Sequence, residues 1–354
     1  MDIKRSPATL STCAEPALLR WTLLTLLSCA AVVVAGGACQ QHLEQIPVDY
    51  DDDVTGDDDA TGDDDTGDDD TGDDDTGDDD TGDDDTGDDD TAPAEVVQTL
   101  AVGQQHSCGI QAGGSLSCWG SNEAGQTDAP GGSFVQMSGL YSHTCAIGDD
   151  GEVTCWGDDT FAGQLDAPTG EFLQLAAGRN HTCGVRFGGS VACWGSNGEG
   201  QNDAPDGAYV QVSAGYRYSC GLNDDQSIVC WGEPDSGRLE PPEGEFRQIA
   251  CGHRFGCALA IDGGVTCWGS DEYGQQDSPS GTDFVWIAAG LSHACAIDSD
   301  SAVQCWGWDS KGQATAPSGD FVSVAGGYQH TCGVDAGGDW ICWGGNDDGQ
   351  STPP

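Results

Sequence analysis

Residues 181–201 read His-Thr-Cys-Gly-Val-Arg-Phe-Gly-Gly-Ser-Val-Ala-Cys-Trp-Gly-Ser-Asn-Gly-Glu-Gly-Gln. Two short apolar segments, 181–185 and 190–195, flank a Phe-Gly-Gly turn at 187–189, a pattern that predicts an antiparallel hairpin. The Gly/Asn-rich residues that follow predict a loop. The hairpin therefore predicts an all-β unit.

Further segments extend this hairpin on both sides. Residues 172–178, Phe-Leu-Gln-Leu-Ala-Ala-Gly, predict a strand before it. Residues 201–205 predict a short outer edge segment, where Pro205 is acceptable because an edge need not donate to a ladder. We therefore expect a four-stranded antiparallel unit.

The unit recurs seven times without a gap, at intervals of 37 or 38 residues. Cys-Trp-Gly marks each copy, and another cysteine lies ten residues before it. A repeat of this length made of strands predicts a closed seven-bladed β-propeller, and a linear β-solenoid is the alternative. The expected blades are residues 97–133, 134–171, 172–208, 209–245, 246–283, 284–320 and 321–354.

The hairpin register predicts a disulfide within each blade. If the turn is symmetric, Cys183 faces Cys193 and Val185 faces Val191, and the equivalent second pair is apolar in all seven copies. Opposed residues of antiparallel strands lie within disulfide reach. The tryptophan beside the second cysteine then points to the other face, toward a neighbouring blade. The expected pairs are Cys108 with Cys118, Cys145 with Cys155, Cys183 with Cys193, Cys220 with Cys230, Cys257 with Cys267, Cys295 with Cys305, and Cys332 with Cys342.

The motifs His-Thr-Cys-Gly-Val, Cys-Trp-Gly-Ser-Asn, Gly-Gln and Ala-Pro resemble the regulator of chromosome condensation repeat family, in its cysteine-bearing exported bacterial form. The resemblance covers Val97 to Pro354 and implies a seven-bladed propeller. The eukaryotic namesake promotes nucleotide exchange on a small GTPase and contacts chromatin, which does not fit an exported acidic protein. A nearer analogue is the secreted bacterial β-lactamase inhibitory propeller, which binds an enzyme on one face.

Charge and cysteine content restrict the function further. The chain carries 61 acidic and 10 basic residues, and from Val97 onward the counts are 32 and 7. We expect no nucleic-acid partner, because phosphate backbones require a concentrated basic patch. The 18 cysteines include no Cys-x-x-Cys pair, so the usual zinc and iron–sulfur spacings are absent. Disulfides in an oxidising compartment are the simplest interpretation.

The N-terminal residues 1–39 predict export. Lys4, Arg5 and Arg20 precede an apolar run at 21–35 that ends in small residues and Cys39. Cys39 resembles the acylated cysteine of a bacterial lipoprotein, although Gly36 stands where Leu or Val is usual, and Cys29 is a rival. Plain secretion and an uncleaved membrane anchor are the alternatives. Each places the remaining chain outside the cytoplasm, as an outer-membrane or cell-surface lipoprotein or a periplasmic or secreted protein.

Residues 40–96 predict a disordered acidic linker. Thr-Gly-Asp-Asp-Asp repeats fill 51–91 and offer nothing apolar to bury, while their like charges repel. A calcium site is the alternative, but glycine falls where the third ligand of an EF-hand loop should stand. We therefore expect a spacer between a membrane anchor and the propeller at 97–354.

The regular residues have structural explanations. A histidine precedes the first cysteine of five blades by two positions, but Tyr218 and Phe255 occupy that position in two others, so we expect packing and no metal site. The periodic Gly-Gln pairs predict a turn residue and an amide that satisfies backbone groups. No catalytic motif is present, and no cofactor is expected.

Function is then expected where the blades differ from one another. The candidate interaction surface lies at the rim of blades four to six, because arginine and aromatic residues favour interfaces; drift among repeats is the alternative. We expect a non-enzymatic binding or scaffold propeller that recognises a protein or a glycan, and an extracytoplasmic enzyme with a carboxylate site is the second hypothesis. Guanine-nucleotide exchange is a third, less favoured one. The surface residues are Arg238, Arg247, Arg254, Trp286 and Trp308.

Overall fold

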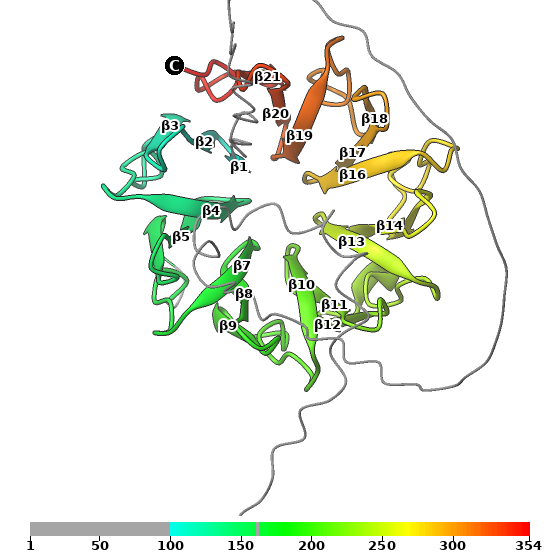
Figure 1. The fold of residues 1–354 in the computed structure, drawn as a ribbon, viewed down its shortest axis with the longest axis horizontal. Coiled ribbons are helices and arrows are strands. Elements are labelled where there is room, and N and C mark those ends of the chain that lie inside the picture. The colour runs from blue at the N-terminus through cyan, green and yellow to red at the C-terminus, as the bar shows by residue number, and fades with distance from the viewer. Residues whose placement is uncertain (1–99, 161–162) are drawn as a thin grey trace, which may run out of the picture. The chain divides into compact units, whose positions relative to one another are not determined.

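The computed structural model describes residues 100–160 and 163–354. These residues form seven three-stranded antiparallel sheets arranged around a centre, which confirms the all-β seven-bladed propeller (Figure 1). Each sheet is built from one continuous stretch of chain. The strands are β1 Leu100–Val102, β2 His106–Ile110, β3 Leu116–Gly120, β4 Phe134–Gly139, β5 His143–Gly148, β6 Val153–Gly157, β7 Phe172–Ala177, β8 His181–Arg186, β9 Val191–Gly195, β10 Tyr209–Ala214, β11 Tyr218–Asn223, β12 Ile228–Gly232, β13 Phe246–Cys251, β14 Phe255–Ala260, β15 Val265–Gly269, β16 Phe284–Ala289, β17 His293–Asp298, β18 Val303–Gly307, β19 Phe321–Gly326, β20 His330–Asp335 and β21 Trp340–Gly344.

The prediction of a fourth strand was wrong. The outer segment of the blade at 172–208 forms turns, in which the Asp203 N–H donates to the Gly200 carbonyl at 3.1 Å. Pro205 has no N–H to donate, and the turns use the N–H groups of Gly200 and Asp203, so this segment does not extend the ladder. A short 3₁₀ helix, η1 (Asp235–Gly237), replaces part of the equivalent segment in blade four.

The hairpin register is as predicted. Cys183 pairs with Cys193 and Val185 with Val191, and the same pairing holds in the other six blades. All seven expected disulfides are formed, one in each blade. The sequence periodicity therefore predicted the internal geometry of the blade.

Adjacent blades share their hydrophobic cores. At the interface of blades two and three, Cys145 and Ile147 of β5 pack against Phe172, Leu175 and Trp194 of the next blade. The disulfide thus lies on one face of its sheet and the tryptophan on the other, as expected. Because a single three-stranded sheet has no core of its own, stability comes from these interfaces.

Each tryptophan also donates a hydrogen bond to the preceding blade. The Trp194 Nε1–H donates to the backbone carbonyl of Gln164 at 3.0 Å, and the six other Cys-Trp-Gly tryptophans make the equivalent bond. The Gln201 side chain accepts from the Glu199 N–H at 2.9 Å, within its own loop. The Gly-Gln pairs therefore hold a turn in the shape that the next tryptophan requires, which confirms their structural interpretation.

Blades seven and one close the ring through side chains. Trp340 stacks on Trp119 with ring centroids 5.3 Å apart, and it covers Gly109, where a Cβ atom would lie 2.3 Å from the indole. Ser107 donates to the Gln350 carbonyl at 3.0 Å and contacts His330 at 2.8 Å. Closure thus depends on the large indole of Trp340, at a position that is aliphatic in the other six blades.

Candidate binding site

The periodic histidines hold neighbouring blades together. His143 Nε2 lies 2.8 Å from the Thr182 hydroxyl of the next blade, and His106, His181, His293 and His330 meet a threonine or serine in the same way. We call the position two residues before the first cysteine of each blade the ring slot. Burial lowers the pKa of these imidazoles, to about 4 for His106, His143 and His293 and to about 3 for His181 and His330. The histidines are neutral structural links.

The two blades without a slot histidine change the partner as well. Tyr218 donates to the Phe255 carbonyl, and Gly256 stands in the next blade where a threonine or serine would bond a slot histidine. For Phe255, the residue at that position of the next blade is Ala294. The buried thiol of Cys251 lies beside Tyr218, and burial raises its pKa to about 11. A thiol with a raised pKa is a poor nucleophile, so the irregularity of Cys251 is one of packing.

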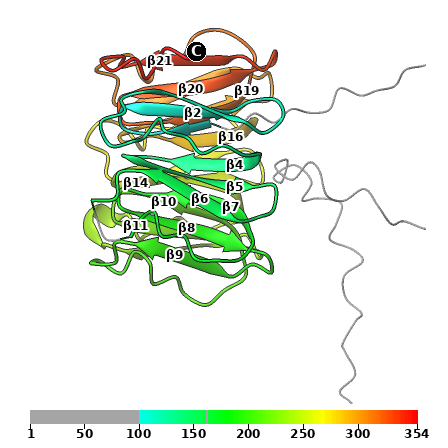
Figure 2. The same cartoon turned by 90° about the vertical axis from the view of Figure 1, so that its left-hand side faces the viewer.

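The seven loops that follow the first strands gather at one end of the propeller. The two ends differ: we call the end where β4, β7 and their equivalents finish the loop face, and the end where they begin the hairpin face (Figure 2). The residue two positions before the ring slot lies on the loop face in every blade. These seven residues are Gln104, Tyr141, Arg179, Tyr216, His253, Leu291 and Tyr328.

Residues from different blades meet at the centre of the loop face. Leu140, Tyr141 and Leu291 form a buried cluster against which Tyr216 and Tyr328 pack. The Tyr216 ring lies 5.8 Å from the Tyr141 ring and 4.2 Å from the His253 imidazole, between centroids. Backbone bonds tie the loops together, as in the His253 N–H donating to the Leu291 carbonyl at 2.9 Å. This tyrosine cluster fills the centre of the loop face.

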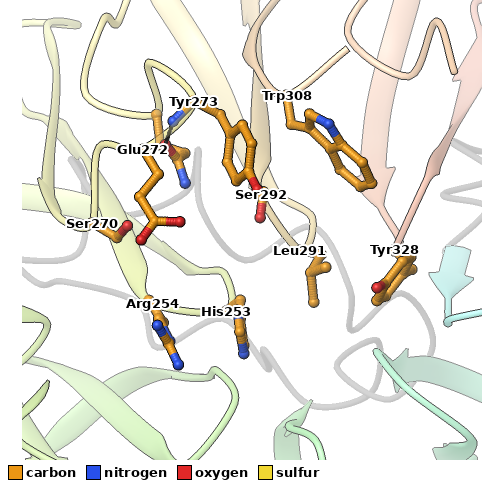
Figure 3. Close-up of a pocket in the computed structure, with 10 residues that line it drawn as sticks. His253, Arg254, Ser270, Glu272, Tyr273, Leu291, Ser292, Trp308 and Tyr328 are labelled. Atoms are coloured by element: carbon orange, nitrogen blue, oxygen red, sulfur yellow. Dashed lines mark hydrogen bonds between the residues drawn. The ribbon is translucent and has the colours of Figure 1, made fainter. Parts of the chain in front are cut away.

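A pocket of about 270 Å³ opens beside the tyrosine cluster, between blades five, six and seven. Trp308 and Tyr328 lie on one side of it, with Arg254, Ser270 and Glu272 on the other (Figure 3). Tyr273 reaches the same space from an outer loop and is 50% exposed. The Trp308 ring lies 5.8 Å from Tyr273 and 6.3 Å from Tyr328, so three aromatic rings face one pocket.

The pocket-lining residues include both basic and neutral polar groups. Burial and the neighbouring Arg254, Arg238, Arg179 and Arg217 lower the pKa of His253 to about 4, so its imidazole is neutral near pH 7. Glu272 is the one carboxylate among the lining residues. In the described part of the chain, no group of three or more His, Cys, Asp or Glu residues is arranged to hold a metal ion.

Sequence and structure comparisons place this architecture in a family. The model of the regulator of chromosome condensation (RCC1) repeat matches seven segments, residues 97–126, 138–164, 172–201, 209–238, 246–275, 285–313 and 321–350. The chain belongs to the RCC1 repeat family. No curated protein sequence matches it.

Several solved structures share the fold of this RCC1 repeat propeller. The ectodomain of the Arabidopsis thaliana receptor kinase ACR4 is 28% identical, with a TM-score of 0.59 over 69% of this chain and 96% of that one. The ectodomain of the Physcomitrella patens receptor kinase CR4 is 25% identical, with a TM-score of 0.62 over 70% and 73%. Prp20p from Saccharomyces cerevisiae, at 16% identity and a TM-score of 0.57 over 66% and 81%, shares the fold alone.

The structure separates the five predicted surface residues of this RCC1 repeat propeller. Arg254 and Trp308 line the pocket on the loop face. Arg247 and Trp286 lie near the hairpin face, where Arg247 donates to the Phe284 carbonyl and Trp286 to the Val324 carbonyl at 3.1 Å. Trp286 also lines an axial cavity of about 200 Å³ formed by the first strands. The predicted residues therefore do not form one surface.

The prediction for Arg238 was wrong, because its side chain is fully buried. It occupies the place of the glutamine in the other blades, with Nη1 2.8 Å from Glu233 and Nη2 2.9 Å from Asp235. Its guanidinium carbon lies 5.6 Å from the centroid of the Tyr218 ring. The irregular loop of blade four thus accommodates a buried guanidinium that pairs with two partly exposed carboxylates, and its sequence differences serve packing.

Several residues of the loop face were not predicted from the sequence, among them Arg179, Tyr216, His253, Tyr273 and Tyr328. A signal was present: the position two before the ring slot holds five residue types in seven blades, while the slot itself is a ring in all seven. Comparing the blades column by column would have identified all of these residues except Tyr273.

Proposed function

We propose that this RCC1 repeat propeller is a non-enzymatic binding protein that holds a protein partner on its loop face. The tyrosine cluster and the pocket carry the proposal, because aromatic and arginine side chains around a pocket provide most of the binding energy at protein interfaces. Trp308, Tyr328 and Arg254 lie together there, and Tyr273 is half exposed at the rim. A glycan is the alternative ligand, and the same experiment distinguishes the two.

The pocket favours binding over catalysis. Hydrolysis by carboxylates requires two acids placed on either side of the scissile bond. Glu272 is the one acid that lines this pocket, and His253, with its pKa lowered to about 4, is a weak base. We therefore place the enzymatic hypothesis second.

The disulfides and the structural neighbours support a place outside the cytoplasm. Seven disulfides require an oxidising compartment, and two similar structures, at 28% and 25% identity, are receptor ectodomains. We propose further that acylation of Cys39 tethers the chain to a membrane and that residues 40–96 act as the spacer. Both segments lie outside the described residues. Within residues 100–160 and 163–354, no helix has the length and apolarity needed to cross a bilayer.

The binding proposal is tested with matched surface variants. The purified chain is incubated with extracytoplasmic proteins of the source organism and, separately, with a glycan array. We expect one protein to bind saturably, and Trp308→Ala to weaken its affinity about thirtyfold, equivalent to about 2 kcal/mol. The matched control is Phe187→Ala, because Phe187 is 78% exposed at a hairpin tip on the opposite face. Equal loss in both variants, or saturable binding of glycans only, would contradict the proposal.

The tether is tested independently of the ligand. Cells that produce the chain are labelled with a fatty-acid analogue, and Cys39→Ala is compared with Cys29→Ala. We expect the label to disappear only in the Cys39→Ala variant. Label retained by that variant would rule out acylation at Cys39.

A further inference from the structure

We propose that Arg179 on the loop face binds a carboxylate of the partner protein, carried by an aspartate or glutamate side chain. This inference rests on the proposed function, because it names the chemistry of the partner at the same face. Arg179 lies in the loop after β7, two positions before the ring slot of blade three.

Two tyrosines hold the Arg179 guanidinium in place. Its carbon lies 4.5 Å from the centroid of the Tyr216 ring and 6.0 Å from that of Tyr141. One of its N–H groups donates to the Tyr216 hydroxyl. Cation–π contacts orient the planar group without using its other N–H donors. The guanidinium is therefore fixed in position while it keeps its capacity to bind an anion.

Among the residues that the structure describes, Arg179 is the one basic side chain without a carboxylate or a backbone carbonyl as acceptor. Among the seven basic residues in the described part of the chain, Arg217, Arg238, Arg254 and Lys311 have a carboxylate within 4.0 Å. Arg186 and Arg247 instead donate to the carbonyls of Thr169 and Phe284. Arg179 has neither kind of acceptor, although the propeller region carries 32 acidic residues against 7 basic ones.

A partly buried cation without an anion is unfavourable, since burial removes hydration that no ion pair replaces. The surroundings of Arg179 add no negative charge in compensation. Tyr141 and His253 are neutral near pH 7, because burial raises the pKa of Tyr141 and lowers that of His253 to about 4. An incoming carboxylate would supply the missing charge and accept up to two parallel hydrogen bonds.

The position of Arg179 favours a protein side chain over a sugar. Arg179 is not among the residues that line the pocket beside Trp308. Arg179 is separated from the pocket-lining residues by the tyrosine cluster, and it contacts Tyr141 of that cluster. A protein covering the loop face reaches Arg179 with an extended acidic side chain while it places another group in the pocket. A single sugar ring held in the pocket has the Tyr216 ring, which contacts both His253 and Arg179, between itself and the guanidinium.

The test uses small probes on the purified full chain, followed by nuclear magnetic resonance of the arginine Nε–H groups. The probes are acetyl-glutamate N-methylamide, its neutral glutamine counterpart, and glucuronate. We expect saturable binding of the glutamate probe, at least tenfold tighter than the glutamine probe, with the Arg179 resonance shifting. No saturable binding of the glutamate probe, or glucuronate binding tenfold tighter than it, would overturn the proposal.

Variants assign the binding to Arg179. Arg179→Gln should weaken the glutamate probe at least tenfold, while Arg179→Lys should weaken it less, because a lysine keeps the charge but not the bidentate geometry. The matched control is Arg186→Gln, which removes an arginine stacked 4.6 Å from the Phe172 ring on the hairpin face. A loss in the control as large as in Arg179→Gln would show that overall charge, and not Arg179, binds the probe.

The two proposals fail separately. If the glutamate probe does not bind but partner binding still depends on Trp308, only the assignment of Arg179 is wrong. If the probe binds at Arg179 and no protein partner depends on Trp308, the proposed function is wrong while the anion site stands.

Discussion

The interior of the propeller and its loop face are built from the same repeat, yet they follow opposite rules. Between blades, the tryptophan donates to the preceding blade in seven of seven cases, and every slot histidine meets a hydroxyl of the next blade. On the loop face, two residues away along the chain, seven positions hold five different residue types. The interior repeats the same contact with a neighbouring blade around the ring, whereas the loop face packs different residue types from blade to blade.

This difference shows where function can be placed on a repeat protein. A change at the ring slot requires a change in the adjacent blade, as Tyr218 with Gly256 and Phe255 with Ala294 illustrate. A change at Tyr141 or Tyr328 requires no matching change in the backbone pairing. The proposed binding residues lie at positions that the ring brings together but does not use for its repeated backbone pairing.

The interior should fail first in acid. The five slot histidines have folded pKa values of about 4 or 3, below the unfolded value of about 6.5, so the unfolded state binds more protons between those values. Above pH 6.5 these histidines do not reduce the free energy of unfolding. Below that pH the free energy of unfolding should fall by about 1.4 kcal/mol per pH unit for each histidine. Urea denaturation at pH 7 and pH 5 measures this. An equal free energy of unfolding at the two pH values would contradict this role of the slot histidines.

The buried arginine of blade four should matter next most. Arg238→Ala should lower the free energy of unfolding by about 3 kcal/mol, because it removes a fully buried side chain with its hydrogen bonds to Glu233 and Asp235 and leaves a cavity. Arg217→Ala is the control, since Arg217 and Glu199 are both about 40% exposed and such pairs contribute less than about 1 kcal/mol. Denaturation curves of the two variants measure this difference. Similar losses in both would show that Arg238 is not a structural element.

Exchanging a slot pair should have a smaller effect. Ser219→Ala alone leaves the buried Nε2 of His181 without a partner and should cost about 1–3 kcal/mol. His181→Phe together with Ser219→Ala copies the Phe255 and Ala294 pair, so the double variant should recover about 1 kcal/mol relative to the sum of the single variants. Strictly additive losses would argue against coupling between neighbouring blades.

The loop face should contribute least to stability. Tyr273→Ala removes a half-exposed ring at the rim and should change the free energy of unfolding by less than about 0.5 kcal/mol. Thermal unfolding of this variant beside wild type checks the value. A loss above about 2 kcal/mol would mean that the loop face also supports the fold.

The sequence predicted the blades well because their determinants are local. The Cys183 and Cys193 spacing, the symmetric turn and the alternation of side chains fix the register within a few residues, and all seven copies agree. The fourth strand was the exception, since Pro205 and the loop hydrogen bonds before it compete with the ladder.

The site was less predictable because ring closure assembles it. Trp308 and Arg254 were identified because they differ from the equivalent residues of the other blades. Such a difference does not show whether a side chain is exposed. Arg238 also differs from its counterparts, yet it is buried. Arg179 and Tyr216 lie on adjacent blades, 37 residues apart, and Tyr141 meets Leu291 of a distant blade at the centre of the propeller. Their contact depends on the curvature of seven packed blades, which no local pattern encodes.

The central claim is that a protein partner covers the loop face and not the hairpin face. A photoreactive phenylalanine analogue placed at Tyr273 or at Phe187, two exposed aromatic positions on opposite faces, tests this in cells that make the chain. The account predicts a discrete crosslinked protein from position 273 that disappears when Trp308→Ala is added, and none from position 187. A crosslink from position 187 alone would contradict it.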